Sequence, residues 1–143
     1  AGSALSGRPL TPAASIIFVA FGALFAAFYP LTQLYQMDVD RERGDRTLAL
    51  RLGVGRSLVV ALLGVGITFG MLAGAAWASE WGGREGWLRW GLLGLAGAAW
   101  IVVLGPWYLR GRGWSTTEHQ RGMYHALAAW ALTDIAVLVA WAV

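Results

Sequence analysis

The sequence contains no cysteine, which excludes disulfide bonds and thiolate metal sites. Lysine is also absent, so all 11 basic residues are arginine. Charged residues make up only 13% of the chain, whereas about 25% is usual in a soluble domain. Hydrophobic residues reach 57%, and 143 residues cannot enclose that much apolar surface in water. The composition therefore predicts an integral membrane protein.

Apolar residues occur in four runs, each close to the ~20 residues that cross a bilayer as a helix. The runs cover approximately residues 12–36, 57–78, 86–109 and 122–143. We expect an all-α, polytopic membrane helix bundle with four transmembrane helices, forming a single transmembrane domain over residues 1–143. Because the sequence begins at Ala1 rather than at Met, we also expect this domain to be a fragment of a larger one.

The arginines between the apolar runs predict the orientation in the membrane, because cytoplasmic loops carry an excess of Lys and Arg. Eight of them lie in the first and third loops: Arg41, Arg43, Arg46, Arg51, Arg56, Arg110, Arg112 and Arg121. We therefore expect loops 37–56 and 110–121 to be cytoplasmic and both termini to lie outside, in a multi-pass protein of the cell inner membrane. This placement explains the net charge of +3 without a nucleic-acid partner.

Glycine and tryptophan also follow the pattern of a membrane bundle. Gly66, Gly70 and Gly74 recur every four residues, which predicts a seam for close helix packing. Tryptophans flank the second and third loops, as in the aromatic belts at membrane–water interfaces: Trp77, Trp81, Trp87, Trp90, Trp107 and Trp114.

A stripe of polar residues leads from the first apolar run into loop 37–56. Tyr29, Gln33, Gln36 and Asp40 are spaced four, three and four residues apart, so a continuous helix would place them on one face. A helix surface that faces lipid would not carry two glutamines. We therefore expect this stripe to face the bundle interior or a cavity that opens to the cytoplasm.

The loop itself is dense in charge, with four acids and three arginines between Asp38 and Arg46. Carboxylate oxygens suit Mg²⁺, which binds one or two carboxylates and completes its shell with water and phosphate oxygens. Arginine side chains hold phosphate by charge and by forked hydrogen bonds. The pattern favours a ligand with a diphosphate head and a hydrocarbon tail. The alternative is that these charges merely neutralise one another at the membrane surface.

Residues 40–48, Asp-Arg-Glu-Arg-Gly-Asp-Arg-Thr-Leu, resemble the second aspartate-rich motif of the UbiA superfamily of membrane prenyltransferases. Members commonly read D-x-x-x-D-R-x-x-G-(K/D)-R-T-L, followed by an apolar stretch and a glycine, here Leu52-Gly53. The family fold has nine transmembrane helices, and this motif lies on the cytoplasmic side between the sixth and the seventh. The resemblance thus implies that the chain corresponds to helices six to nine of that fold.

The resemblance implies an intramembrane transferase that moves a prenyl group from a prenyl diphosphate to a lipid-soluble, often aromatic acceptor in quinone, chlorophyll or related lipid biosynthesis. It implies Mg²⁺ as the cofactor, with Asp40 and Asp38 as catalytic metal ligands assisted by Gln36. It also implies diphosphate binding by Arg43, Arg46, Gln33 and Asp45. Tyr29 would line the cavity.

The sequence departs from the family pattern in two places. Gln36 occupies the position where the family often has the first aspartate, so either the metal site carries less charge here or Asp38 replaces that ligand. The family's first motif, an Asn/Asp-rich loop after the second helix, is not present in these residues. We therefore expect the chain to need the missing N-terminal half and to be inactive alone.

Asp134 lies near the middle of the last apolar run, where an acid is costly and usually faces the protein interior. It would line the substrate cavity or, as we favour, pair with a polar group on another helix. Asp134 and the polar stripe also allow a different function. The chain would then be a non-enzymatic membrane subunit, or half of a transporter, with a cation-binding cytoplasmic loop.

Overall fold

The computed structural model describes residues 10–82 and 85–142, and its regular elements are all helical. They are α2 (Pro12–Leu34), α3 (Met37–Arg43), α4 (Leu48–Ala78), α5 (Gly86–Arg110), the 3₁₀ turn η1 (Gly111–Gly113) and α6 (Thr116–Ala142). Four of these helices, α2, α4, α5 (with η1) and α6, are long and apolar enough to cross a membrane. The predicted all-α fold with four membrane-spanning helices is confirmed.

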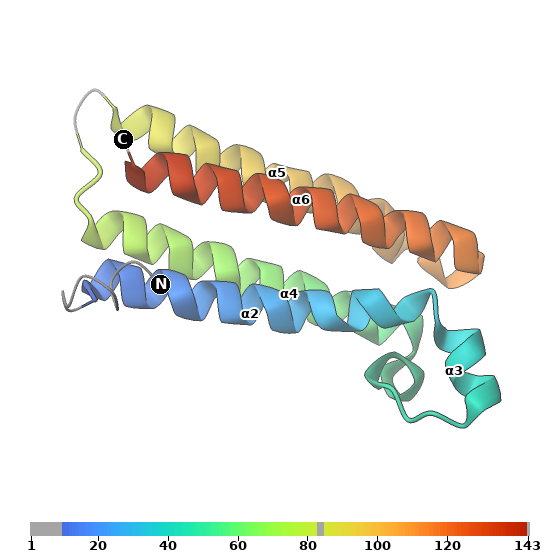
Figure 1. Cartoon of the computed structure of the whole chain (residues 1–143). Helices are drawn as coiled ribbons and strands as arrows, with labels where there is room; N and C mark the ends of the chain where they lie inside the picture. The colour runs from blue at the N-terminus through green and yellow to red at the C-terminus, as the bar shows by residue number, and fades with distance from the viewer. Residues whose placement is uncertain (1–9, 83–84, 143) are drawn as a thin grey trace.

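The long helices run up and down as two antiparallel pairs, α2 with α4 and α5 with α6 (Figure 1). The segment between α2 and α4 and the segment between α5 and α6 lie at the same end of the bundle. The start of α2 and the end of α6 lie at the opposite end. The two arginine-rich connections are therefore on one side, as the charge pattern predicts.

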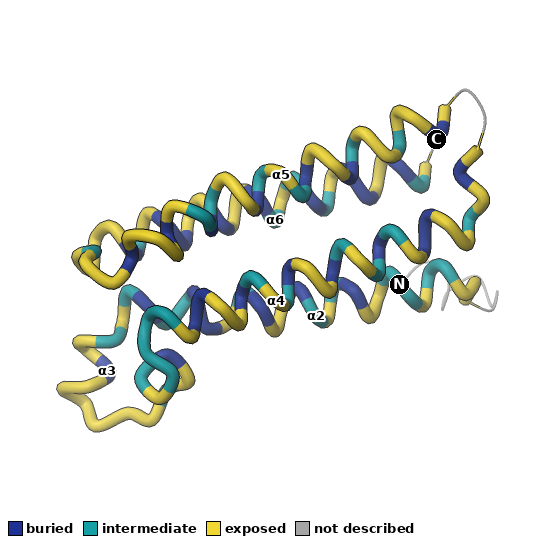
Figure 2. Tube along the Cα trace, turned by 180° about the vertical axis from the view of Figure 1, so that it is seen from behind, coloured by how far each residue is buried: buried dark blue, intermediate teal, exposed yellow. Residues whose placement is uncertain are grey.

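The outer surface of the bundle is apolar along its whole length. Large side chains there are exposed, for example Phe25 at 64%, Leu63 at 62% and Ile101 at 70%. Figure 2 shows the buried residues as stripes on the inner faces of the helices, where Leu24, Leu58 and other apolar residues form the core. Apolar residues on both the inside and the outside of a bundle are the arrangement expected of a protein whose solvent is lipid.

The close helix contact does not lie on the predicted glycine seam. A Cβ built on Gly66, Gly70 or Gly74 would have no neighbouring atom within 4 Å, so none of these glycines makes a close contact with another described helix. Gly64 instead makes the close approach, because its Cβ would lie 2.5 Å from the Cβ of Ala27. The four-residue spacing identified the right helix but the wrong face of it.

The tryptophans divide into two groups. Trp77 and Trp87 are 82% and 72% exposed at the end opposite α3, as expected of an interfacial belt. Trp107, predicted to be interfacial, is instead fully buried, and its Nε1 donates a hydrogen bond to Nδ1 of His119 at 2.9 Å. Its indole also stacks on Trp114, with ring centroids 5.7 Å apart. Trp107 therefore fastens α5 to the start of α6.

The segment 37–56 is not an open loop as predicted. It contains α3 and the first turns of α4, and only residues 44–47 between them are not helical. The backbone of α4 breaks at Gly53, which has φ 71° and ψ 168°. Charged residues lower the local hydropathy of this segment, and for that reason its helices were missed.

Candidate metal and diphosphate site

The polar stripe is divided between two helices. Helix α2 ends at Leu34, and the chain turns at Tyr35 and Gln36 before α3 begins at Met37 (Figure 1). The turn is held by a hydrogen bond from the Gln36 amide to the Gln33 carbonyl at 3.1 Å. The expectation that Tyr29, Gln33, Gln36 and Asp40 share one helix face is therefore wrong beyond Gln33.

Both glycines of the sequence motif occupy backbone conformations that other residues adopt only with strain. Gly44 ends α3 in the left-handed region at φ 74°, and the Asp45 amide then donates to the Asp40 carbonyl at 2.9 Å. Gly53, at φ 71°, forms the break in α4. The motif thus encodes a short helix, a tight turn and a second short helical segment.

Asp40 is the buried acid of α3. It is 7% exposed and is the one buried residue of this helix, which packs against α4. Its Oδ2 atom is fully covered and has no hydrogen-bond partner among residues 10–82 and 85–142. A buried carboxylate oxygen without a partner is costly, so this atom favours a cation or a hydrogen-bond donor from outside the described residues.

Asp38 lies on a different face of α3. Two residues apart on a helix means a rotation of roughly 200°, so the two carboxylates diverge. Asp38 is exposed and forms an ion pair with Arg41 at 2.9 Å. It also accepts a hydrogen bond from the Thr116 hydroxyl of α6 at 3.3 Å. The structure therefore does not bring Asp38 to Asp40, and Asp38 connects α3 to α6 instead.

The two glutamines have partners within the protein. The Oε1 atom of Gln33 accepts a hydrogen bond from the Ala49 amide at 3.1 Å, in the first turn of α4. It thus satisfies a helix N-terminal donor that the Thr47 side chain leaves uncapped. Gln36 is exposed, and its Nε2 donates to the Tyr35 hydroxyl at 2.7 Å. In this arrangement both amides stabilise the turn and the start of α4.

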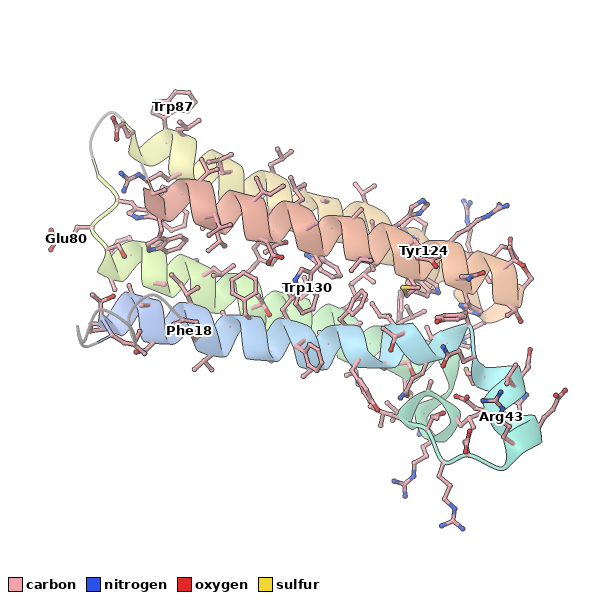
Figure 3. The ribbon with its side chains drawn as sticks, in the orientation of Figure 1. Phe18, Arg43, Glu80, Trp87, Tyr124 and Trp130 are labelled. Atoms are coloured by element: carbon pink, nitrogen blue, oxygen red, sulfur yellow. The ribbon has the colours of Figure 1, made fainter. Side chains whose placement is uncertain are left out.

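Three of the residues predicted to hold diphosphate lie at the end of α3 or directly after it. Arg43 lies on α3, beyond the end of the four-helix bundle (Figure 3). Arg43, Asp45 and Arg46 are all exposed, and none of them takes part in an ion pair within the described part of the chain. Their charges are therefore available to a ligand, and none of these side chains is fixed in place by a salt bridge.

The described residues do not form a complete metal site. No group of three or more His, Cys, Asp or Glu side chains is arranged to hold a metal ion in residues 10–82 and 85–142. Mg²⁺ nevertheless needs only one or two protein carboxylates when phosphate oxygens and water complete its shell. The unpartnered oxygen of Asp40 fits one such ligand, whereas Asp38 and Gln36 do not converge on it.

Asp134 and Tyr29 lie away from this group. Asp134 is half-buried in α6 and lines an apolar hollow of about 440 Å³ between α2 and α6, with Ile17, Phe18, Phe21, Val137 and Leu138. Trp130, one turn before Asp134, lies between α6 and α2 (Figure 3) and packs edge-on against Phe28. The ion pairs of the described residues do not include Asp134, and Tyr29 is 49% exposed on α2.

The sequence did not predict the contact between Trp107 and His119. This contact joins α5 to α6 at the end of the bundle that carries α3. His119 is 6% exposed, and both its neighbours in the cluster are indoles, Trp107 and Trp114. Trp114 and His119 are five residues apart across the break between η1 and α6, and this spacing matches no single helix face. A tertiary contact of this kind leaves no periodic signal.

No family model matches the chain, and comparisons with curated proteins and with solved structures find no matching protein. The resemblance to the UbiA superfamily therefore depends on the motif residues and on the order of the membrane helices.

Proposed function

We propose that this chain carries the diphosphate-binding part of an intramembrane prenyltransferase. The observation that carries the proposal is the Asp40 carboxylate, which is buried beside α4 with one oxygen unpartnered. A motif whose charges only neutralised one another at the surface would expose this acid or pair it with an arginine. Asp38 and Arg41 form such a surface pair, whereas Asp40 has no ion pair within the part of the chain that the structure describes.

In this function Asp40 would bind Mg²⁺, and exposed Arg43 and Arg46 would hold the diphosphate oxygens by charge and hydrogen bonding. The bound ion would neutralise charge on the departing diphosphate. The bond between the allylic carbon and the diphosphate oxygen breaks, the acceptor carbon supplies the electron pair of the new bond, and the acceptor then loses a proton. The hydrocarbon tail of the prenyl diphosphate would lie among the apolar helices.

The contacts of these side chains support different residue roles from those that the resemblance implies. Asp38 is assigned to the contact between α3 and α6, and Gln33 and Gln36 to the turn and the start of α4. Asp40 is then the single carboxylate ligand that these residues supply. Further ligands would come from a second acidic motif on an N-terminal half, so we propose that this chain has no activity without that half.

Binding of geranyl diphosphate tests the proposal, with the chain co-expressed with a family N-terminal half and purified in detergent. We expect binding in Mg²⁺ and none in EDTA. Asp40→Asn keeps the shape of the side chain and should abolish the Mg²⁺-dependent binding. Asp38→Asn removes the same charge two residues away and should retain it.

Two results would contradict the proposal. A folded, co-purifying pair that binds no geranyl diphosphate would refute the function. Equal losses in Asp40→Asn and Asp38→Asn would refute the assignment of Asp40 and indicate a general effect of loop charge. The helix content and elution profile of each variant report whether it is folded.

We also propose that the protein resides in the cell inner membrane, with the end that carries α3 in the cytoplasm and both termini outside. The excess of arginine in the two connections at that end supports this orientation.

A second candidate function rests on Asp134, an acid that lines an apolar hollow within the membrane-spanning part of α6. An ionisable residue at such a depth marks ion paths in many membrane proteins. This function predicts cation or proton uptake by proteoliposomes that contain the purified chain. The uptake should disappear in Asp134→Asn and persist in Asp40→Asn, and a chain without any uptake would exclude it.

A further inference from the structure

A second basic site lies at the break in α4, and the charged motif residues of segment 38–46 do not line it. At the α3 end of the bundle, η1 packs against α4 near the break at Gly53. An open hollow of about 430 Å³ lies between the two elements and is lined by Leu52, Gly53, Val54, Gly55, Arg56 and Arg112. Asp40, Arg43 and Arg46 do not line it.

The charge of this hollow is positive and uncompensated. Arg56 comes from α4 and Arg112 from η1, so two elements distant in sequence each bring an arginine to the hollow. Neither arginine forms an ion pair with an acid of the described residues. Two arginines that line one hollow, without an acidic partner among the described residues, favour an anionic ligand.

Gly55 admits the Arg112 side chain to the hollow. A Cβ built on Gly55 would lie 3.0 Å from Nη2 and 3.1 Å from Nε of Arg112, so the guanidinium lies directly against this glycine. The break at Gly53 also makes Val54–Arg56 the first turn of the remaining helix. The start of a helix carries partial positive charge, which adds to that of the arginines.

We propose that this hollow binds a phosphate group, by the forked guanidinium groups of Arg56 and Arg112 over the backbone of Gly53–Gly55. The site lies at the α3 end of the helices that are long and apolar enough to span a membrane, and the ends of such helices reach the headgroup region of a bilayer. An anionic lipid headgroup and a soluble phosphate compound share this chemistry. The proposal does not depend on prenyl transfer, because it uses none of the residues assigned to that function.

The test compares two probes on the full chain in non-ionic detergent. Native mass spectrometry measures the binding of dioctanoyl phosphatidylglycerol, and equilibrium dialysis measures that of inorganic pyrophosphate. Arg56→Gln and Arg112→Gln should each weaken binding about fivefold, from the typical contribution of one basic residue near an anionic headgroup. Arg110→Gln is the matched control, because it removes the same charge beside η1 without lining the hollow.

Steric variants provide an independent readout. Gly55→Val should weaken binding because its side chain would displace the Arg112 guanidinium, whereas Gly113→Val should not, since a Cβ there has no neighbour within 4 Å. Arg112→Lys keeps the charge but loses the fork, and should retain part of the affinity. A normal circular dichroism spectrum shows that each variant is folded.

The two probes identify the source of the phosphate. Loss of phosphatidylglycerol binding in Arg56→Gln and Arg112→Gln, but not in Arg110→Gln, assigns the site to a lipid headgroup. The same pattern with pyrophosphate alone assigns it to a soluble phosphate compound. If neither probe distinguishes these two variants from Arg110→Gln, the hollow is not a phosphate site and the proposal is wrong.

Discussion

The contact between α2 and α4 at Gly64 predicts a large effect from the smallest possible substitution. The Cβ of an alanine at position 64 would lie 2.5 Å from the Cβ and 3.2 Å from the Cα of Ala27. Neither atom belongs to a flexible side-chain end that can rotate away. The clash in Gly64→Ala can therefore be relieved only if the two helices move apart.

The magnitude follows from two opposing contributions. Overpacking a well-packed contact costs about 1–3 kcal/mol, whereas replacing glycine by alanine inside a helix stabilises it by up to ~1 kcal/mol. Gly70→Ala is the matched control, because it is in the same helix and its Cβ would have no neighbour within 4 Å. The helix contribution is common to both variants. Gly64→Ala should therefore be less stable than Gly70→Ala by about 1–3 kcal/mol.

Unfolding of the purified chain by SDS in mixed micelles measures this difference. Tryptophan fluorescence and circular dichroism together report the loss of packing and of helix. Adding Ala27→Gly to Gly64→Ala moves the methyl group from one helix to the other, and it should recover most of the lost stability. Equal stability of Gly64→Ala and Gly70→Ala, or no recovery in the double variant, would show that α2 and α4 do not meet here.

Three further changes test other parts of the structure. Trp107→Phe leaves the buried Nδ1 of His119 without its donor and should lower the free energy of unfolding by about 1–3 kcal/mol; an unchanged SDS midpoint would contradict this contact. Gly53→Ala places a Cβ at φ 71° and should lower the free energy of unfolding by about 1–3 kcal/mol in the same assay. An unchanged SDS midpoint would show that α4 does not break at Gly53. Because the chain has no cysteine, Arg46→Cys should react with a membrane-impermeant maleimide only from the cytoplasm and Trp87→Cys only from outside. The opposite labelling pattern would show that the proposed orientation in the membrane is wrong.

Hydropathy was sufficient to predict the four membrane helices because length and apolar character are local properties of the chain. Their bounds were less accurate where charge interrupts them. Helix α4 starts at Leu48, and Arg51 and Arg56 lie exposed on its first turns. A helix that begins at the membrane surface can carry arginines on its polar side, and a hydropathy pattern cannot separate such a segment from a loop.

Contacts between helices were less predictable, because glycine spacing does not say which face meets a neighbour. Gly66, Gly70 and Gly74 have the spacing of a packing seam but face open space, whereas Gly64 lies against Ala27. Trp107 fits an interfacial belt by position, yet it is buried against His119. In both cases the outcome depends on the partner helix, and this information is not local.

The same limit explains why the sequence motif did not reveal that the side chains of Asp38 and Asp40 diverge. Asp38 and Asp40 are two residues apart, and a turn at Tyr35 and Gln36 sets the rotation of α3 relative to the bundle. That rotation exposes Asp38 to Arg41 and buries Asp40. Asp38 already has a counter-ion in Arg41, whereas the Oδ2 atom of Asp40 has no partner among residues 10–82 and 85–142.

If Asp40 is the single metal ligand from this chain, the chain supplies one carboxylate to the proposed Mg²⁺ site. Mg²⁺ tolerates this only when phosphate oxygens and a second acidic motif supply the rest of its shell. The proposed function therefore predicts that metal binding by this chain depends on the diphosphate and on the opposing half. Mg²⁺ alone should therefore bind this chain weakly. Mg²⁺ and the prenyl diphosphate should bind cooperatively when the N-terminal half is present.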